Sequence, residues 1–222
     1  MRKTHQYIYN MIINEGYKDN SLTYIFETTE GLRKEYRVVD LFNTIRDIEK
    51  TALRILPRNS RILDVGAGAG RISVYLQKEG FDVTALEKSR VICDILKRRG
   101  VRKIVNADIF EYSPGERYDV VLFFYAWSIL GKTKDSIEKV FVLLNDRLLH
   151  KDGLVFFVFK DYFFSGSVFM KRRFIFKGQK SFWFKTYIFD SEKLVSVGQR
   201  YGWCVKYYYK DSAKQYYLIM GK

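Results

Sequence analysis

Runs of consecutive apolar residues alternate along the chain with segments in which apolar residues recur every three or four positions. The apolar runs predict strands buried on both faces, at 61–65, 81–86, 101–105, 118–124 and 154–159. The helical spacing predicts helices at 40–56, 69–79, 89–100, 137–148 and 190–202. This alternation predicts an α/β fold with a mostly parallel sheet and helices on both faces.

The two ends of the chain depart from this alternation. Strands are predicted at 203–209 and 215–220, and the short turn between them makes the two antiparallel, so one strand of the sheet is reversed. Residues 1–39 are less regular, with a short helix at 5–14 and an extended piece at 23–26. We predict a single domain with an N-terminal appendage (1–39), a core (40–160), an insertion (160–189), and a last helix and hairpin (190–222).

Composition narrows the class of protein. The 222 residues suit one domain, and a hydrophobic content of 47% excludes general disorder. The two cysteines, Cys93 and Cys204, lie in apolar segments, which is typical of a reduced cytoplasmic protein. Each apolar run is far shorter than the ~20 residues of a membrane span. His, Cys, Asp and Glu show no metal-ligand spacing, so we predict no metal site.

A glycine-rich segment follows the first core strand. Gly66, Gly68 and Gly70 stand at alternate positions between the strand and the next helix. Glycine lets the backbone turn tightly and approach a ligand, and the helix presents free N–H groups at the same place. In an open parallel sheet this is the edge where ligands bind. Alone, the pattern fits a dinucleotide equally well.

Three acidic residues narrow the choice of ligand. Asp64 lies two residues before the first glycine, where a carboxylate repels a pyrophosphate and attracts an ammonium group. Glu87 ends the second strand and is placed to accept hydrogen bonds from both hydroxyls of a ribose. Asp108 follows the third strand and can accept from an exocyclic amine. Together with the G-x-G-x-G spacing, Asp64 disfavours a dehydrogenase.

With these residues in register, the chain resembles the class I S-adenosylmethionine-dependent methyltransferases of the small-molecule type. The resemblance covers about 40–160 and includes the run Tyr118–Val121. It implies a three-layer, Rossmann-like sandwich around a seven-stranded, mostly parallel sheet with one antiparallel C-terminal strand. It also implies S-adenosyl-L-methionine as the cofactor and methyl transfer as the reaction.

The resemblance assigns roles to residues of this chain. The glycine segment would hold the methionine part of the cofactor, with Asp64 orienting its amino group. Glu87 would bind the ribose, Lys88 would pack beside the ribose or adenine, and Asp108 with Ile109 would contact the adenine. The implied cofactor-binding residues are Asp64, Gly66, Ala67, Gly68, Gly70, Glu87, Lys88, Asp108, Ile109 and Phe124.

The acceptor is left open by the sequence. The Asp/Asn-Pro-Pro-Tyr/Phe signature common among N-methyltransferases of this family is replaced after the fourth strand by the run 124–128. This departure argues against nucleic-acid enzymes that target adenine or an amide. Tyr24, Tyr36, Tyr125 and Trp127 are candidates for the acceptor pocket. No residue identifies itself as a general base; His150 is predicted to be a surface residue, and His5 a solvated one that could fold over the site.

Positive charge is concentrated in the last part of the chain. The formal net charge is +14, and residues 161–222 contain twelve basic and four acidic side chains. Within 171–185, basic residues are interleaved with aromatic ones, as on surfaces that stack bases and contact phosphates. The simpler interpretation is a lid or pair of strands with aromatic side chains inward and Lys and Arg solvated outward.

Three hypotheses therefore stand. The first is a methyltransferase with a small-molecule acceptor. The second is a methyltransferase acting on RNA, or on a protein, docked on the basic stretch 171–185. The third is a non-catalytic module that binds the cofactor. The sequence does not predict the oligomeric state.

Overall fold

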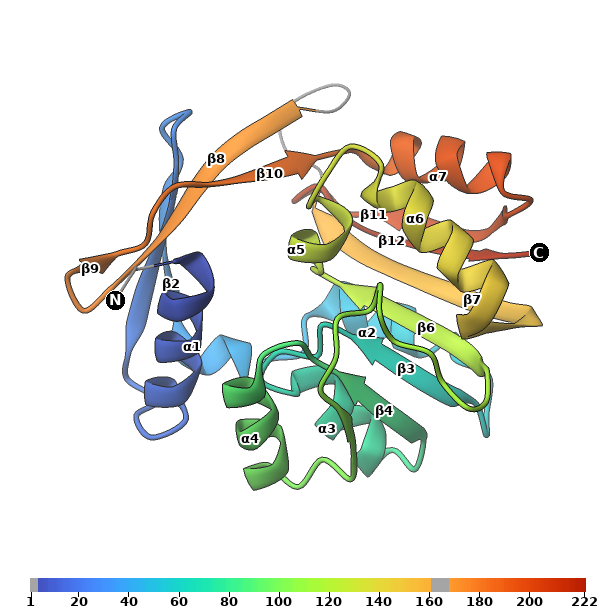
Figure 1. The fold of residues 1–222 in the computed structure, drawn as a ribbon, viewed down its shortest axis with the longest axis horizontal. Helices are drawn as coiled ribbons and strands as arrows, with labels where there is room; N and C mark the ends of the chain where they lie inside the picture. Colours follow the sequence, from blue (N-terminus) through green and yellow to red (C-terminus); the bar gives the residue numbers. More distant parts are fainter. Residues whose placement is uncertain (1–3, 161–167) are drawn as a thin grey trace.

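The computed structural model describes residues 4–160 and 168–222. Figure 1 shows a large sheet flanked by helices on the right and a smaller sheet on the left. The strands of the large sheet are β3 (Arg61–Val65), β4 (Asp82–Leu86), β5 (Lys103–Val105), β6 (Tyr118–Phe124), β7 (Leu149–Lys160), β11 (Cys204–Lys210) and β12 (Gln215–Gly221). Its helices are α2 (Asp47–Leu53), α3 (Arg71–Lys78), α4 (Arg90–Arg98), α5 (Trp127–Leu130), α6 (Ser136–Leu143) with the π-turn η2 (Leu144–Leu148), and α7 (Ser191–Arg200).

The large sheet has seven strands in the order β11-β12-β7-β6-β3-β4-β5. Pairing is parallel from β5 to β7, whereas β12 runs antiparallel to both of its neighbours. The short connection between β11 and β12 imposes this reversal. The predicted mostly parallel sheet with one antiparallel C-terminal strand is therefore confirmed.

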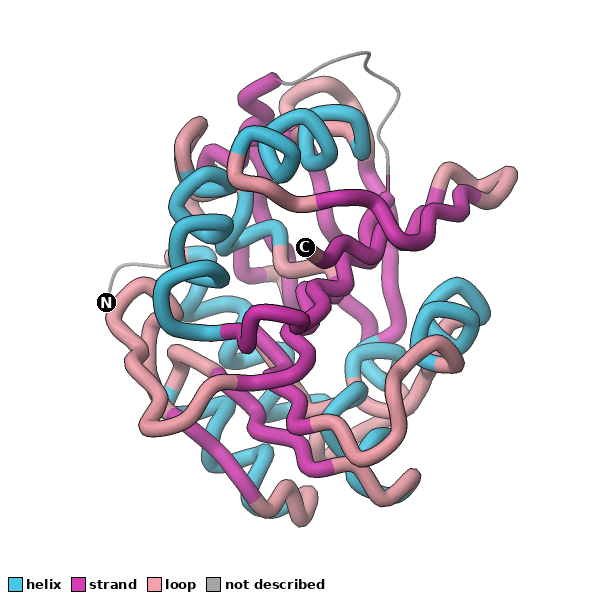
Figure 2. The backbone as a smooth tube through the Cα atoms, turned by 90° about the vertical axis from the view of Figure 1, so that its right-hand side faces the viewer, coloured by secondary structure: helices cyan, strands magenta, loops and turns pink. Residues whose placement is uncertain are grey.

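Helices cover both faces of the large sheet, as Figure 2 shows. Successive side chains of β6 point to opposite faces, so Val121 and Phe123 pack with α6 and α7, while Val120 and Leu122 pack with α2 and α3. Both groups are fully buried. This alternation explains why the central strands are apolar throughout and gives the three layers that the sequence predicts. None of the helices in the described ranges is long and apolar enough to cross a membrane.

The smaller sheet joins two segments that are far apart in the sequence. It consists of β1 (Thr23–Thr28), β2 (Arg33–Arg37), β8 (Val168–Phe176), β9 (Gln179–Lys180) and β10 (Phe184–Ile188). The main order is β10-β8-β1-β2, with antiparallel pairing throughout and β9 beside β8. The sequence predicts the extended piece at 23–26 and offers a lid or pair of strands for 171–185, but it does not anticipate that the N-terminal segment and the insertion form one sheet.

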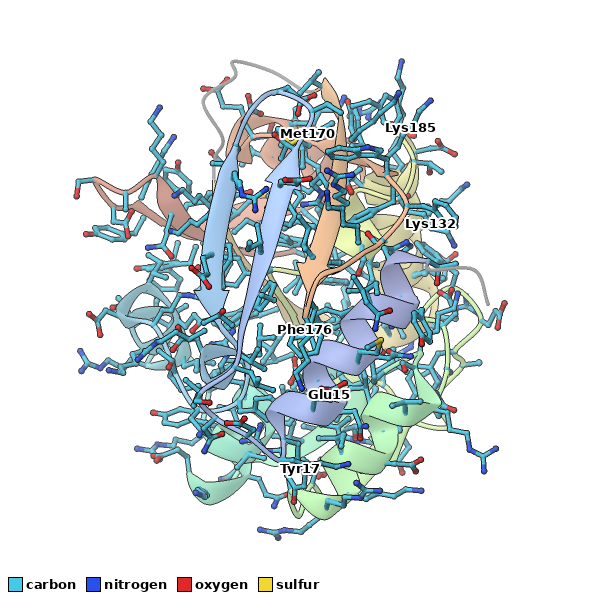
Figure 3. The ribbon with its side chains drawn as sticks, turned by 90° about the vertical axis from the view of Figure 1, so that its left-hand side faces the viewer. Glu15, Tyr17, Lys132, Met170, Phe176 and Lys185 are labelled. Carbon is cyan, nitrogen blue, oxygen red and sulfur yellow. The ribbon has the colours of Figure 1, made fainter. Side chains whose placement is uncertain are left out.

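Helix α1 (His5–Gly16) connects the small sheet to the large one. Thr4 caps it, because its hydroxyl accepts a hydrogen bond from the Tyr7 N–H at 3.1 Å. Its buried side chains, such as Ile12, form one apolar cluster with Phe176 of β8 and Ile95 of α4. The face of the small sheet that packs on α1 is called the inner face below, and Figure 3 shows the sheet with α1 beside it.

The predicted helix at 40–56 is wrong in its first half. A 3₁₀ turn, η1 (Val38–Leu41), comes first, and α2 begins only at Asp47. The reason is local, because Glu49 Oε2 accepts a hydrogen bond from the Arg46 N–H at 2.7 Å and so fixes the start of the helix.

The prediction that Lys and Arg of the basic stretch all point outward is wrong for Arg172. Only 6% of this residue is exposed, and its Nε and Nη2 donate to Thr186 Oγ1 at 3.0 and 2.7 Å. In β8, Arg172 alternates with Lys171 and Arg173, so it points to the inner face while its neighbours point away. On the outer face, Arg173 pairs with Glu27.

Candidate active site

The glycine segment forms a loop between β3 and α3 with an unusual backbone. Gly66, Gly68 and Gly70 have φ angles of +69°, +54° and +80°, a region that other residues rarely adopt. The N–H groups of Gly66 and Ala67 donate to the Leu86 carbonyl at 2.8 and 3.1 Å, which ties the loop to the end of β4. The three glycines are therefore required by the path of the chain.

Gly66 and Gly68 also add no side chain to the space above the loop, which Ile129 and Tyr9 approach from the other side. A Cβ atom on Gly68 would lie 3.5 Å from the Tyr9 hydroxyl, and one on Gly66 would lie 3.2 Å from Ile129. Side chains at these positions would fill the space that the bare backbone faces. This cradle fits the amino-acid part of S-adenosylmethionine, which needs close contact with the backbone.

Asp64 lies on β3 beneath the loop and is buried, with 3% of its surface exposed. Its Oδ2 accepts a hydrogen bond from Ser73 Oγ at 2.6 Å. Burial raises the pKa of Asp64 to about 6, although the Ser73 hydrogen bond and the charge of Arg71 act in the opposite direction. Such a carboxylate gains from a cationic ligand, because an ammonium group would compensate its buried charge.

Glu87 follows β4 directly and faces the same loop. Its carboxylate accepts hydrogen bonds from the N–H groups of Gly68 at 3.1 Å and Ser89 at 2.8 Å. Burial raises the pKa of Glu87, while these hydrogen bonds act to lower it. The carboxylate is thus held at the strand end and keeps acceptor capacity for hydroxyl groups.

Asp108 lies three residues after β5 and is paired with Lys88. The Lys88 Nζ donates to Asp108 Oδ2 at 2.8 Å, and Lys132 Nζ lies 4.0 Å from the same oxygen. Burial acts to raise the pKa of Asp108, but the Lys88 and Phe110 N–H hydrogen bonds and the lysine charges together hold it below its ordinary value. Ile109 beside it is 3% exposed.

Tyr125 follows β6 at the same edge in a strained conformation, with φ of 55°. Its hydroxyl donates to Gln215 Oε1 of β12 at 2.8 Å, and the Arg46 guanidinium lies 4.6 Å from the ring centroid. Phe124, which precedes it, is 8% exposed. Trp127 packs into the apolar core against Phe159, with ring centroids 4.7 Å apart.

Tyr24 and Tyr36 lie on the inner face of the small sheet. Their rings stack at 5.5 Å, in a different apolar cluster from those of Tyr125 and Trp127. The charge of Arg46 acts on the hydroxyls of both Tyr24 and Tyr125. The four pocket candidates therefore divide into a pair on the small sheet and a pair after β6.

Sequence reasoning missed a buried ion cluster beside the glycine loop. Glu49 has no exposed side-chain surface and pairs with Arg71, the residue after the third glycine, and with Arg46 at 3.5 Å. Arg71 Nη1 also donates to the Thr44 carbonyl at 3.0 Å. An acidic residue on the apolar stripe of α2 is the signal that could have indicated this cluster.

We expect Glu49→Gln to lower the free energy of unfolding by about 2 kcal/mol, because it leaves two partly buried guanidinium groups without their shared carboxylate. Urea unfolding followed by tryptophan fluorescence measures this loss. Asp47→Asn on the same helix is the control, because the Asp47 side chain is 99% exposed and its loss should cost less than about 0.5 kcal/mol. Equal losses in both variants would contradict a special role for Glu49.

The two histidines occupy different surroundings. His5 begins α1 and is half-buried, with its ring 4.4 Å from that of Phe184. Burial and the charge of Arg172 lower the pKa of His5, so the ring is neutral at pH 7. The prediction that His5 is solvated is therefore wrong. His150 is exposed, as predicted, and borders a surface hollow with Trp203, away from the glycine loop.

Comparisons with known proteins agree with this geometry. A family model described as a methyltransferase domain matches residues 39–205. A SAM-dependent methyltransferase from Bacteroides fragilis, solved with S-adenosyl-L-homocysteine, is similar with a TM-score of 0.79 and 22% identity over 96% of this chain and 93% of that chain. No match was found among curated proteins.

Two further solved structures share the fold. The glycopeptide N-methyltransferase MtfA, complexed with S-adenosyl-L-methionine, has a TM-score of 0.63 and 13% identity over 81% of this chain and 94% of that chain. A TehB-like SAM-dependent methyltransferase from Corynebacterium glutamicum has a TM-score of 0.58 and 20% identity over 81% of this chain and 89% of that chain. This chain belongs to the methyltransferase-domain family, and its fold is that of the class I S-adenosylmethionine-dependent methyltransferases.

Proposed function

We propose that the protein transfers a methyl group from S-adenosyl-L-methionine to a small-molecule acceptor. One observation carries this proposal: the glycine loop, Asp64, Glu87 and Asp108 lie at the carboxyl ends of three adjacent parallel strands, β3, β4 and β5. Ligands bind at that edge of open α/β sheets. The glycine loop offers a backbone cradle. The three carboxylates follow one another along the sheet edge in the same order as the amino group, the ribose and the adenine along the cofactor.

When bound, S-adenosylmethionine supplies an activated methyl group on a sulfonium. The protein's own residues then bind and orient. In this proposal Asp64 accepts hydrogen bonds from the ammonium group, Glu87 accepts from the ribose hydroxyls, and Asp108 with Ile109 contacts the adenine. Gly66, Ala67, Gly68 and Gly70 provide the backbone contact, while Lys88 holds Asp108 in place. Orientation and exclusion of water supply most of the acceleration in such a reaction.

The small sheet and α1 favour a small acceptor. Helix α1 lies over the glycine loop, and its apolar cluster includes Ala69 of the loop and aromatic residues of the inner face. We infer that the described parts of the N-terminal segment and the insertion (4–39 and 168–189) together form a cover over the core, and that the acceptor binds under it. Tyr24 and Tyr36 would line the pocket from the small sheet, and Phe124, Tyr125 and Trp127 from the end of β6. A covered site of this kind suits a molecule that can be enclosed.

The RNA hypothesis finds less support in the same region. Lys171 and Lys185 are exposed, but Arg172 is buried, and Arg173 and Lys177 are paired with Glu27 and Glu15. One of the six basic residues of 171–185 is therefore withdrawn from the surface, and two more are paired with carboxylates. Each pairing reduces the charge available to phosphates.

Titration calorimetry tests cofactor binding, and a labelled methyl group tests the acceptor. We expect S-adenosyl-L-homocysteine to bind at one site with micromolar affinity, and label from S-adenosylmethionine to enter the low-mass fraction of a metabolite extract. Absence of binding at millimolar concentration would overturn the proposal. Label in RNA, removed by Lys171→Glu with Lys185→Glu, would establish the RNA alternative. Binding without transfer to any fraction would indicate a non-catalytic module.

A further inference from the structure

The hydroxyl of Tyr9 on α1 is aimed at the glycine loop. A Cβ atom on Gly68 would lie 3.5 Å from this oxygen, which places the hydroxyl directly over the backbone of the loop. The charges of Glu87 and Arg71 both act on it. Tyr9 thus reaches from the N-terminal helix to the glycine loop, although the family model matches only residues 39–205.

Over 4–160 and 168–222, the Tyr9 hydroxyl forms no hydrogen bond. Its helical neighbour differs in this respect, because Asn10 Oδ1 accepts from Ser89 Oγ at 3.0 Å and from Gln6 Nε2 at 2.8 Å. Burial raises the pKa of Tyr9 to about 12, so the group is a neutral donor. A phenol hydroxyl that faces the loop without a protein partner is available to donate to a ligand bound there.

The position of this hydroxyl is fixed by packing on two sides. The Tyr9 ring lies 5.7 Å from that of Phe174 on the inner face of the small sheet. Two contacts hold helix α1 in place. Asn10 accepts a hydrogen bond from Ser89, the N-cap of α4, and Gly16 packs so tightly that a Cβ atom there would lie 2.0 Å from Val38. The hydroxyl is therefore presented to the loop in one place.

We propose that the Tyr9 hydroxyl donates a hydrogen bond to the carboxylate of the cofactor's amino-acid part, so that α1 completes the cofactor site. The inference rests on the proposed function. A phenol O–H is a donor, and hydrogen bonds to an anion are stronger than those to neutral acceptors. Glu87, by contrast, is an acceptor and suits the ribose.

Tyr9→Phe tests this inference with the full-length protein and titration calorimetry. We expect the variant to bind S-adenosyl-L-homocysteine about tenfold more weakly, which is the effect of losing one hydrogen bond to a charged group. Its affinity for 5′-methylthioadenosine, which lacks the amino-acid part, should be unchanged. Tyr7→Phe on the same helix is the matched control and should bind both ligands as the wild type does.

The outcomes separate this inference from the proposed function. Failure of the wild-type protein to bind S-adenosyl-L-homocysteine overturns the proposed function itself. Wild-type binding with an unchanged Tyr9→Phe variant overturns only the role of Tyr9. An equal loss for both ligands overturns the assignment to the carboxylate, because 5′-methylthioadenosine has none.

Discussion

Replacement of Gly70 by alanine is expected to lower the free energy of unfolding by about 3 kcal/mol. Two costs add at this position. The φ angle of +80° disfavours any side chain by about 1 kcal/mol, and the new Cβ atom would lie 2.5 Å from Leu96 Cδ2. Leu96 is fully buried, so it has little room to move. The overlap adds about 2 kcal/mol, within the usual range for overpacked cores.

Gly80→Ala is the matched control for this prediction. Gly80 has a φ of +88°, close to that of Gly70, but no atom lies within 4 Å of its added Cβ atom. It should therefore show the backbone cost alone, about 1 kcal/mol. Urea unfolding measures both variants. If the two variants lose the same stability, the contact between the loop and α4 is not tight, and the third glycine is required only by its backbone conformation.

The glycine loop is the part of the site that the sequence predicts best. Glycines at positions 66, 68 and 70 are demanded by three positive φ angles, which are local properties of the chain. The acidic residues follow because the ends of parallel strands meet at one edge of the sheet, so that Asp64, Glu87 and Asp108 gather once the strands are assigned. The glycine spacing and the rule that parallel strands end at one edge of the sheet are therefore sufficient to predict this part of the site.

The small sheet could not be predicted in the same way. The pairing of Phe26 with Phe174 joins residues 148 positions apart, and no local pattern specifies such a register. The inward position of Arg172 follows from that register, as does the contact of Tyr9 with Phe174. Tyr9 also looks like an ordinary residue of an amphipathic helix. The position of its hydroxyl at the loop follows only from the placement of α1.

Substitution of Asp64 by asparagine is expected to have two opposite effects at neutral pH. The cofactor-free protein should become more stable, and its affinity for the cofactor should fall at least a hundredfold. The pKa of Asp64 is about 6 in the folded protein and about 3.8 when unfolded. Above pH 6 both states are ionised, and the folded state bears the cost of a buried charge. Asparagine removes this cost and retains an acceptor for Ser73.

The sign of the pH dependence follows from the raised pKa. Between pH 4 and 6 the unfolded state has lost the proton that the folded state still holds, so wild-type stability falls as pH rises through this window. Asp64→Asn lacks that titration. Its advantage should grow from near zero below pH 4 to about 2–3 kcal/mol above pH 6, since one unit of pKa corresponds to about 1.4 kcal/mol. Urea unfolding at several pH values measures the difference.

Affinity should change in the opposite direction, because the proposed partner of Asp64 is the ammonium group of the cofactor. Loss of the buried charge pair corresponds to at least about 2.7 kcal/mol, or a hundredfold in the dissociation constant for S-adenosyl-L-homocysteine. Asp94→Asn on α4 is the control, because that side chain is 51% exposed and should alter neither quantity. A stabilised Asp64→Asn protein with full affinity would show that the buried carboxylate serves another ligand. A destabilised one would show that the Ser73 hydrogen bond outweighs the cost of burying the charge.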